Sequence, residues 1–332
     1  MRLGTGLPFK PGHRGDIEIF LEDMLMKPLS WKRSRMIFVC SMSDLFADFV
    51  PDEWIDKVFT VMAETPQHTY QVLTKRAARM REYIAGLTPQ PPNGRDFSEI
   101  YATIEKAIER VPAVEWPLPN VWLGVSTERQ LEADERVRLL LDTPAAIRFV
   151  SAEPLLGPID LMRLCILPQK QGSVRAGIHI DAMRGRYCES GVAYKGDWDI
   201  TGPAPPDGER RKLDWVIAGG ESGNSARPMH PDWARSLRDQ CLAAGLPFFF
   251  KQWGEFKPVD GLFGALNLRK RSCAIDIAGK MPQGDPMTDA GVDRITAQIE
   301  TGKFQFMSAI GKKLAGRELD GRLHDAMPER TR

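Results

Sequence analysis

The chain has 332 residues, of which 42% are hydrophobic and 27% charged, a composition typical of a folded protein. Its 45 Lys and Arg residues nearly balance 44 Asp and Glu residues, so the net charge of +1 creates no overall field that would attract nucleic acid or a membrane. The five cysteines are scattered without a C-x-x-C pair, and no apolar run approaches the roughly 20 residues that cross a bilayer. We therefore predict reduced thiols, no metal ligands, no membrane partner and a cytoplasmic location.

A repeated pattern runs along the chain: a short apolar run rich in β-formers, a polar cluster, and a helical stretch. The apolar runs occupy residues 36–40, 70–73, 121–125, 147–150, 215–218 and 247–250. Amphipathic helical patterns follow, most clearly at 52–64, 134–141 and 231–244. Continuous rather than alternating apolar runs are typical of parallel strands that helices bury on both faces. The pattern therefore predicts an α/β fold built on a parallel sheet.

Three stretches interrupt this pattern. Residues 87–119 are rich in proline, and residues 163–212 are rich in glycine, proline and charge, so we expect both to be insertions. Beyond residue 258 the pattern weakens and the end is basic. We predict a main body over 1–258 with insertions at about 87–119 and 163–212, followed by a C-terminal extension with a basic tail over 259–332.

Charged side chains follow several of the predicted strands, where ligands bind in parallel sheets. Asp44, Glu153 and Glu221 follow three strands, and Lys75 and Lys251 lie at the ends of two others. Converging carboxylates suit acid–base chemistry, and a cation beside them suits an anionic substrate, so these five residues are the catalytic candidates. The structural alternative is that each carboxylate caps a helix or pairs with a nearby arginine, and that each lysine is solvated.

Hydroxyl groups and glycines follow the same strands and provide the candidates for cofactor binding. The glycine-rich turn after the fifth run exposes backbone amides that can hold a carboxylate or phosphate, and its alternative is a tight turn from strand to helix. Trp253 offers either a stacking surface or a lid over the strand ends. The cofactor-binding candidates are Ser41, Ser43, Ser126, Gly219, Gly220, Glu221 and Ser222.

Six strings, in chain order, resemble the phage gp-thirty-seven/gp-sixty-eight family of phages, prophages and bacteria. They are residues 35–46, 67–76, 120–128, 148–158, 213–230 and 247–254, and residues 311–322 resemble the closing motif of the family. The resemblance implies a partial (β/α) barrel related to the radical S-adenosylmethionine (SAM) enzymes. It also implies SAM as a cofactor, bound across the strand ends. The expected lining of the mouth is Asp44, Lys75, Ser126, Glu153, Glu221 and Lys251.

One part of the family pattern is missing. Members typically begin with a strand and a cysteine-rich loop that looks like the site of a [4Fe–4S] cluster, and no such loop precedes Met36 here. Either Met1 is an internal start of a longer product, or the chain is a degenerate relative that keeps the barrel without radical chemistry. The expected function is a phage-related radical-SAM-like protein of unknown substrate, truncated or cluster-deficient in this chain; whether it is an enzyme stays open.

The alternative is a cluster-independent protein that binds a nucleotide or nucleic acid. It is motivated by the phage setting and by a basic tail that contains Lys312, Lys313, Arg317 and Arg322. Substrate, reaction and oligomeric state do not follow from the sequence.

Overall fold

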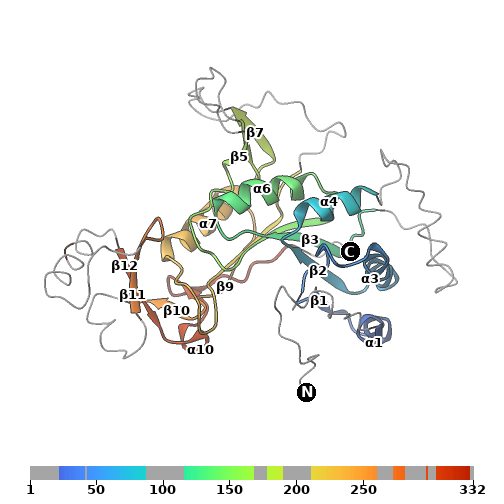
Figure 1. Ribbon diagram of the computed structural model, residues 1–332, viewed down its shortest axis with the longest axis horizontal. Helices are drawn as coiled ribbons and strands as arrows, with labels where there is room; N and C mark the ends of the chain where they lie inside the picture. The colour runs from blue at the N-terminus through green and yellow to red at the C-terminus, as the bar shows by residue number, and fades with distance from the viewer. Residues whose placement is uncertain are drawn as a thin grey trace. The chain divides into compact units, whose positions relative to one another are not determined.

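The computed structural model describes residues 22–41, 43–86, 116–167, 178–189, 211–259, 272–280, 297 and 304–329. Its main sheet has the strand order β1-β2-β3-β4-β8-β9. Figure 1 labels β1, β2, β3 and β9 of this sheet. The bounds are β1 Met36–Val39, β2 Thr69–Thr74, β3 Val121–Ser126, β4 Ile147–Ala152, β8 Trp215–Gly219 and β9 Phe248–Gln252. The pairs β1–β2, β4–β8 and β8–β9 are parallel. The predicted α/β class and parallel strands are therefore confirmed.

The helices follow the predicted alternation with the strands. They are α1 Glu22–Leu25, α2 Lys27–Ser30, α3 Asp52–Glu64, α4 Ala77–Gly86, α6 Gln130–Leu141 and α7 Pro231–Ala244. Helix α7 shows why such a segment begins and ends where it does. His230 Nδ1 accepts a hydrogen bond from the Asp232 amide, Pro231 occupies the first turn, and Gly245 ends the helix at a φ of 67°. Within the described ranges, no helix is long and apolar enough to span a bilayer.

The chain divides into two compact units. Unit 1 contains residues 1–122, 144–146 and 330–332, and unit 2 contains residues 123–143 and 147–329, so β3 carries the boundary. In unit 1, α3 and α4 are joined by the Tyr83 hydroxyl, which donates to Asp56, and by packing of the Tyr83 and Phe59 rings at 5.6 Å. Their inward faces supply the core of this unit: Ile55, Phe59, Met62, Met80, Tyr83 and Ile84.

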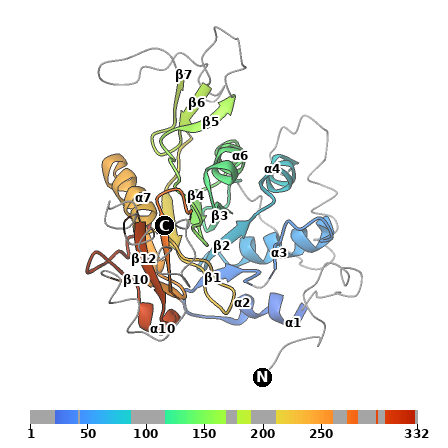
Figure 2. The ribbon, with the colours of Figure 1, turned by 60° about the vertical axis from the view of Figure 1, so that its left-hand side comes forward.

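Unit 2 adds three small antiparallel sheets to its share of the main sheet. One contains β5 Leu164–Leu167, β6 Ile178–Asp181 and β7 Arg186–Glu189 (Figure 2). The second has the order β10-β12-β11, with β10 Phe256–Pro258, β11 Ser272–Asp276 and β12 Phe304–Ala309. The third pairs β13 Glu318–Leu319 with β14 Arg322–Leu323, after helix α10 Lys312–Ala315. Much of the two predicted insertions lies outside the described residues, and the division at residue 258 stays a prediction.

The end of the chain, residues 311–329, folds over the edge of β9, and we call it the C-terminal clasp. The amide of Phe250 donates to the carbonyl of His324 at 2.9 Å, and Phe249 forms an antiparallel bridge with Asp325. The Trp253 indole donates to the Glu318 carbonyl at 2.8 Å. These bonds cover the backbone edge of the last strand in the described sheet.

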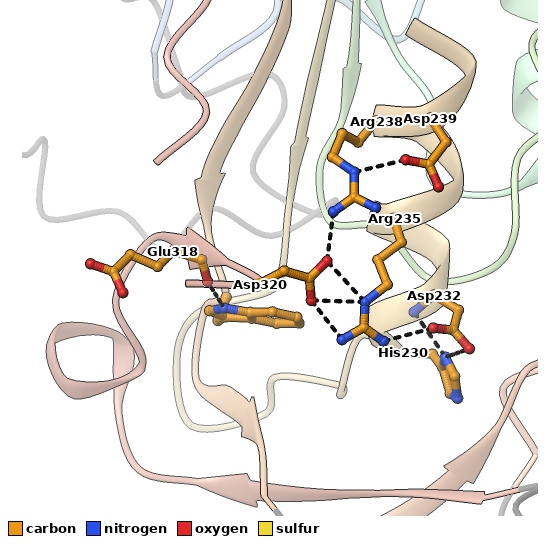
Figure 3. Close-up of polar contacts among 8 residues, drawn as sticks. His230, Asp232, Arg235, Arg238, Asp239, Glu318 and Asp320 are labelled. Atoms are coloured by element: carbon orange, nitrogen blue, oxygen red, sulfur yellow. Dashed lines mark hydrogen bonds and ion pairs between the residues drawn. The ribbon is translucent and has the colours of Figure 1, made fainter. Parts of the chain in front are cut away.

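The turn of the β13–β14 hairpin anchors the clasp to α7. Asp320 and Gly321 both have positive φ, 54° and 72°, as a two-residue hairpin turn of the primed type requires. This turn directs the Asp320 carboxylate toward α7, where it accepts hydrogen bonds from Arg235 and Arg238 (Figure 3). The predicted basic tail is thus held partly by an acidic residue within it.

Candidate functional site

The strand ends of unit 2 bring together two of the predicted catalytic candidates. Glu153 directly follows β4, and Lys251 lies near the end of β9. The Lys251 ammonium donates to Glu153 Oε2 at 3.1 Å, and the Ser151 hydroxyl donates to the same oxygen at 3.2 Å. The Glu153 side chain is 14% exposed and that of Lys251 is 55% exposed. The site therefore joins a mostly buried carboxylate to a cation that water reaches.

Gly219, the last residue of β8, and Gly220 after it allow the chain to approach itself closely. A Cβ on Gly219 would lie 2.4 Å from Glu153 Oε1, and a Cβ on Gly220 would lie 1.9 Å from the carbonyl oxygen of Trp253. Any other residue would thus push β8 away from Glu153 or from the loop after β9. The close approach that these glycines permit is to the protein's own chain, and their binding of a cofactor stays a prediction.

Glu221, which follows the same glycines, is held by an arginine. Arg227 donates from Nε to Oε2 at 2.8 Å and from Nη2 to Oε1 at 3.0 Å, and its backbone amide donates to Oε2 at 2.9 Å. The hydrogen bond to Glu221 raises the pKa of Arg227. Pairing with a nearby arginine was the structural alternative for this residue, and both carboxylate oxygens are engaged in it. Ser222 is exposed and lies 3.2 Å from the side-chain amide of Gln252.

Residues after β3 contribute groups that the sequence did not single out. Arg136 of α6 donates to the Ser126 carbonyl at 2.8 Å and to Glu128 Oε2 at 2.9 Å. Thr127 is fully buried, and its hydroxyl has no hydrogen-bond partner among the residues that the structure describes. The polar string that follows this strand was the available signal for Thr127 and Glu128. Nothing in the sequence pointed to Arg136, which lies on the next helix.

The remaining candidates lie in unit 1. Asp44 Oδ1 accepts from the Thr74 hydroxyl at 2.7 Å and from the Phe46 amide at 3.0 Å, and Oδ2 accepts from the Lys75 amide at 2.8 Å. The carboxylate of Asp44 therefore ties the loop after β1 to the end of β2. The side chains of Lys75, Ser41 and Ser43 are exposed. Convergence of this group with Glu153 and Lys251 in one pocket stays a prediction.

Trp253, a proposed stacking surface, is 4% exposed. Its ring packs edge-on against Phe250 at 5.1 Å, and its indole nitrogen bonds the C-terminal clasp. Trp253, the first residue after β9, is therefore a core residue.

The described residues do not fit an iron–sulfur cluster. Cys40, Cys165, Cys241 and Cys273 are free thiols placed on β1's end, β5, α7 and β11. Within the described ranges, no group of three His, Cys, Asp or Glu side chains is arranged to hold a metal ion. A cluster that leaves one iron open needs three thiolates close together, so no step of the chemistry is assigned to one.

A family model described as "Protein of unknown function (DUF5131)" matches residues 10–328. The chain belongs to this family. No curated protein and no solved structure is significantly similar to the chain. Membership in the DUF5131 family covers nearly the whole chain, both units included. The finer resemblance, to gp-thirty-seven/gp-sixty-eight and radical-SAM proteins, remains an inference from the sequence strings.

Proposed function

We propose that this DUF5131 protein is a radical-SAM-like protein that binds a small zwitterionic ligand at the carboxyl ends of β3, β4, β8 and β9. The arrangement of Glu153, Lys251 and Ser151 carries the proposal. It offers a carboxylate for an ammonium group and an ammonium for a carboxylate, at the edge where parallel sheets bind ligands. SAM has both groups in its methionine part and is the ligand that the family resemblance implies.

The energetics of this ion pair favour ligand exchange. A lysine–carboxylate pair whose cation is half exposed contributes only about 0.2–1 kcal/mol. A ligand with both charges can therefore replace one weak pair by two charge-assisted contacts at little cost. Glu153 would hold the ligand's ammonium through Oε2, the oxygen that now accepts from Lys251 and Ser151, because Oε1 lies against Gly219. Lys251 would turn to the ligand's carboxylate.

We propose that this site binds a ligand, and we assign no reaction step to it. Bound SAM would supply a methyl group or, beside a reduced cluster, a radical, but the described residues provide no ligands for such a cluster. Glu153, Lys251 and Ser151 would orient the ligand, and the buried Ser151 side chain would help to exclude water from its amino-acid end. The same site would serve a cluster-independent protein that binds another adenosyl amino acid.

Isothermal titration calorimetry on the full chain tests the proposal, with SAM, S-adenosylhomocysteine and adenosine as ligands. We expect both adenosyl amino acids to bind at least 10-fold more tightly than adenosine. Glu153→Gln keeps the shape of the side chain and removes its charge, so it should weaken SAM binding by at least 10-fold, as the loss of a charged hydrogen bond implies. Asp239→Asn, on α7 and hydrogen-bonded to Arg238, is the matched control. Absence of binding at millimolar SAM, or equal binding by Glu153→Gln, would refute the site.

The nucleic-acid alternative draws less support from the tail than the sequence suggested. Arg317 pairs with Asp325, and its guanidinium lies 5.2 Å from the Phe249 ring centroid. That cation helps to fix the C-terminal clasp to β9, which leaves Lys312, Lys313 and Arg322 as exposed cations of the tail. The tail as a nucleic-acid site stays a prediction.

A further inference from the structure

Unit 1 carries a cationic surface that the proposed ligand site does not use. It comprises residues 27–38, from α2 through the connecting segment to β1, and we call it the basic strip. Lys27, Lys32, Arg33 and Arg35 are all exposed in it. The sequence contains no acidic residue between Met24 and Ser43. Four positive charges therefore lie along one short stretch of surface.

Among the described residues, the recorded contacts of these cations are to uncharged groups. The Lys27 ammonium lies 2.8 Å from the Met24 sulfur, and the Arg35 guanidinium lies 4.1 Å from the centroid of the Trp31 ring. Within the part of the chain that the structure describes, none of the four forms an ion pair. The neighbouring Arg79 of the same unit does pair, with Asp52 at 3.0 Å. Uncompensated like charges repel one another and are relieved by a polyanion.

Exposed apolar and aromatic side chains directly follow these charges along the chain. Phe38 is 45% exposed and Met36 is 37% exposed, although both belong to a strand of the main sheet. β1 is the end strand of the described sheet, with β2 as its neighbour. Large side chains left open beside cations form the surface on which unstacked bases lie while their phosphates meet Lys and Arg.

Other occupants fit this surface less well. A second copy of the chain, paired edge to edge along β1, would supply no counter-charge to these cations, because residues 25–42 contain no acidic residue. A lipid surface would be met by α1 and α2, which contain four residues each and cannot form an interfacial amphipathic helix. A duplex hides the faces of its bases and would leave Phe38 without a partner. We propose that the basic strip binds single-stranded nucleic acid without sequence preference.

Fluorescence anisotropy with a labelled 15-nucleotide oligo(dT) and the full chain tests the proposal between 50 and 300 mM NaCl. Contacts to three or four phosphates predict a slope of about −2 to −3 in log K against log [salt]. Lys32→Gln with Arg33→Gln should make the slope less steep by about 1.4, because each removes one phosphate contact worth about 0.7. Phe38→Ser should weaken binding by about 5-fold or more with the slope unchanged, because it removes stacking only.

The matched control is Lys312→Gln with Lys313→Gln, which removes two exposed lysines from unit 2 and should leave the affinity unchanged. SAM binding should be unaffected by Lys32→Gln with Arg33→Gln, so this proposal and the ligand site fail independently. The proposal is overturned if oligo(dT) does not bind below 100 µM at 50 mM NaCl. It is equally overturned if a duplex binds as tightly, if the control weakens binding as much, or if vesicles with 30% phosphatidylserine bind where oligo(dT) does not.

Discussion

Removal of the Asp320 charge tests how the C-terminal clasp is held to α7. Asp320 accepts from Arg235 Nη2 at 2.7 Å and from Arg235 Nε at 2.9 Å, and Arg238 donates to its other oxygen (Figure 3). Asp320→Asn is the suitable change, because Asn tolerates the φ of 54° that this turn position requires. The substitution therefore removes the charge and leaves the turn in place.

The expected cost follows from the pKa of Asp320, which the hydrogen bonds from Arg235 lower from 3.8 to about 2. Such a shift corresponds to at most about 2.5 kcal/mol of stability at neutral pH. The Asp320 side chain is 37% exposed, so water and salt screen part of this energy. We expect the variant to lose about 1 to 1.5 kcal/mol.

The loss should depend on pH in a defined direction. The folded-state pKa of Asp320 lies below its unfolded value, so the carboxylate stabilises the fold fully above about pH 4 and progressively less as the pH falls toward 2. Urea unfolding of the wild type and Asp320→Asn, followed by tryptophan fluorescence, measures the difference at each pH. Asp239→Asn is the control, because Asp239 is 62% exposed and accepts from its sequence neighbour Arg238 without joining α7 to the C-terminal clasp. A difference below 0.3 kcal/mol at pH 7, or one that persists unchanged to pH 2.5, would refute the reasoning.

Three further substitutions or treatments have defined outcomes. Gly220→Ala should lower the unfolding free energy by more than about 3 kcal/mol, because its Cβ would clash with the Trp253 carbonyl. Gly223→Ala has open space around its Cβ and should cost about 1 kcal/mol for its φ of 107°, so similar urea midpoints for the two variants would contradict this. Burial raises the pKa of Cys241 to about 12, so iodoacetamide at pH 8 should leave this thiol unmodified in the native protein and modify it in urea, as peptide mass spectrometry would show; native labelling would contradict its burial. Gly124→Ala should destabilise unit 2, because its Cβ would lie 2.5 Å from the Phe149 ring, and Phe149→Leu should recover part of the loss; a double variant no more stable than Gly124→Ala would argue against this packing.

The sheet and its helices could be predicted because their signals are local. All six apolar runs lie within two residues of the observed strand ends; the run predicted at 247–250, for example, is β9 at Phe248–Gln252. Helices α3 and α7 have the predicted bounds. The C-terminal clasp could not be predicted. Its contacts, such as Asp320 with Arg235, join residues 85 positions apart, and no periodicity records such a pair.

We expected charged residues that follow parallel strands to converge at one edge of the sheet. That expectation also explains which parts of the site could be predicted. It brought Glu153 and Lys251 together across 98 positions, because parallel strands place their carboxyl ends at one edge. It could not say that Asp44 would accept three hydrogen bonds from its own surroundings, or that Glu221 would pair with Arg227 six residues on. Those outcomes depend on loop conformations, which follow from packing rather than from spacing.

The difference between the three strand-end carboxylates of unit 2 identifies the one at which a ligand can be exchanged. Glu128 forms an ion pair with Arg136, whose side chain is only 18% exposed. Glu221 accepts two hydrogen bonds from the Arg227 guanidinium, from Nε and Nη2. Displacement of Arg136 would leave a largely buried charge without its partner, and displacement of Arg227 would break a bidentate pair. Both changes cost free energy. Glu153 is met instead by the single ammonium of Lys251, which water already reaches. A lysine on a flexible stem can turn to an incoming anion while the carboxylate takes the cation, so ligand exchange at these strand ends is expected at Glu153.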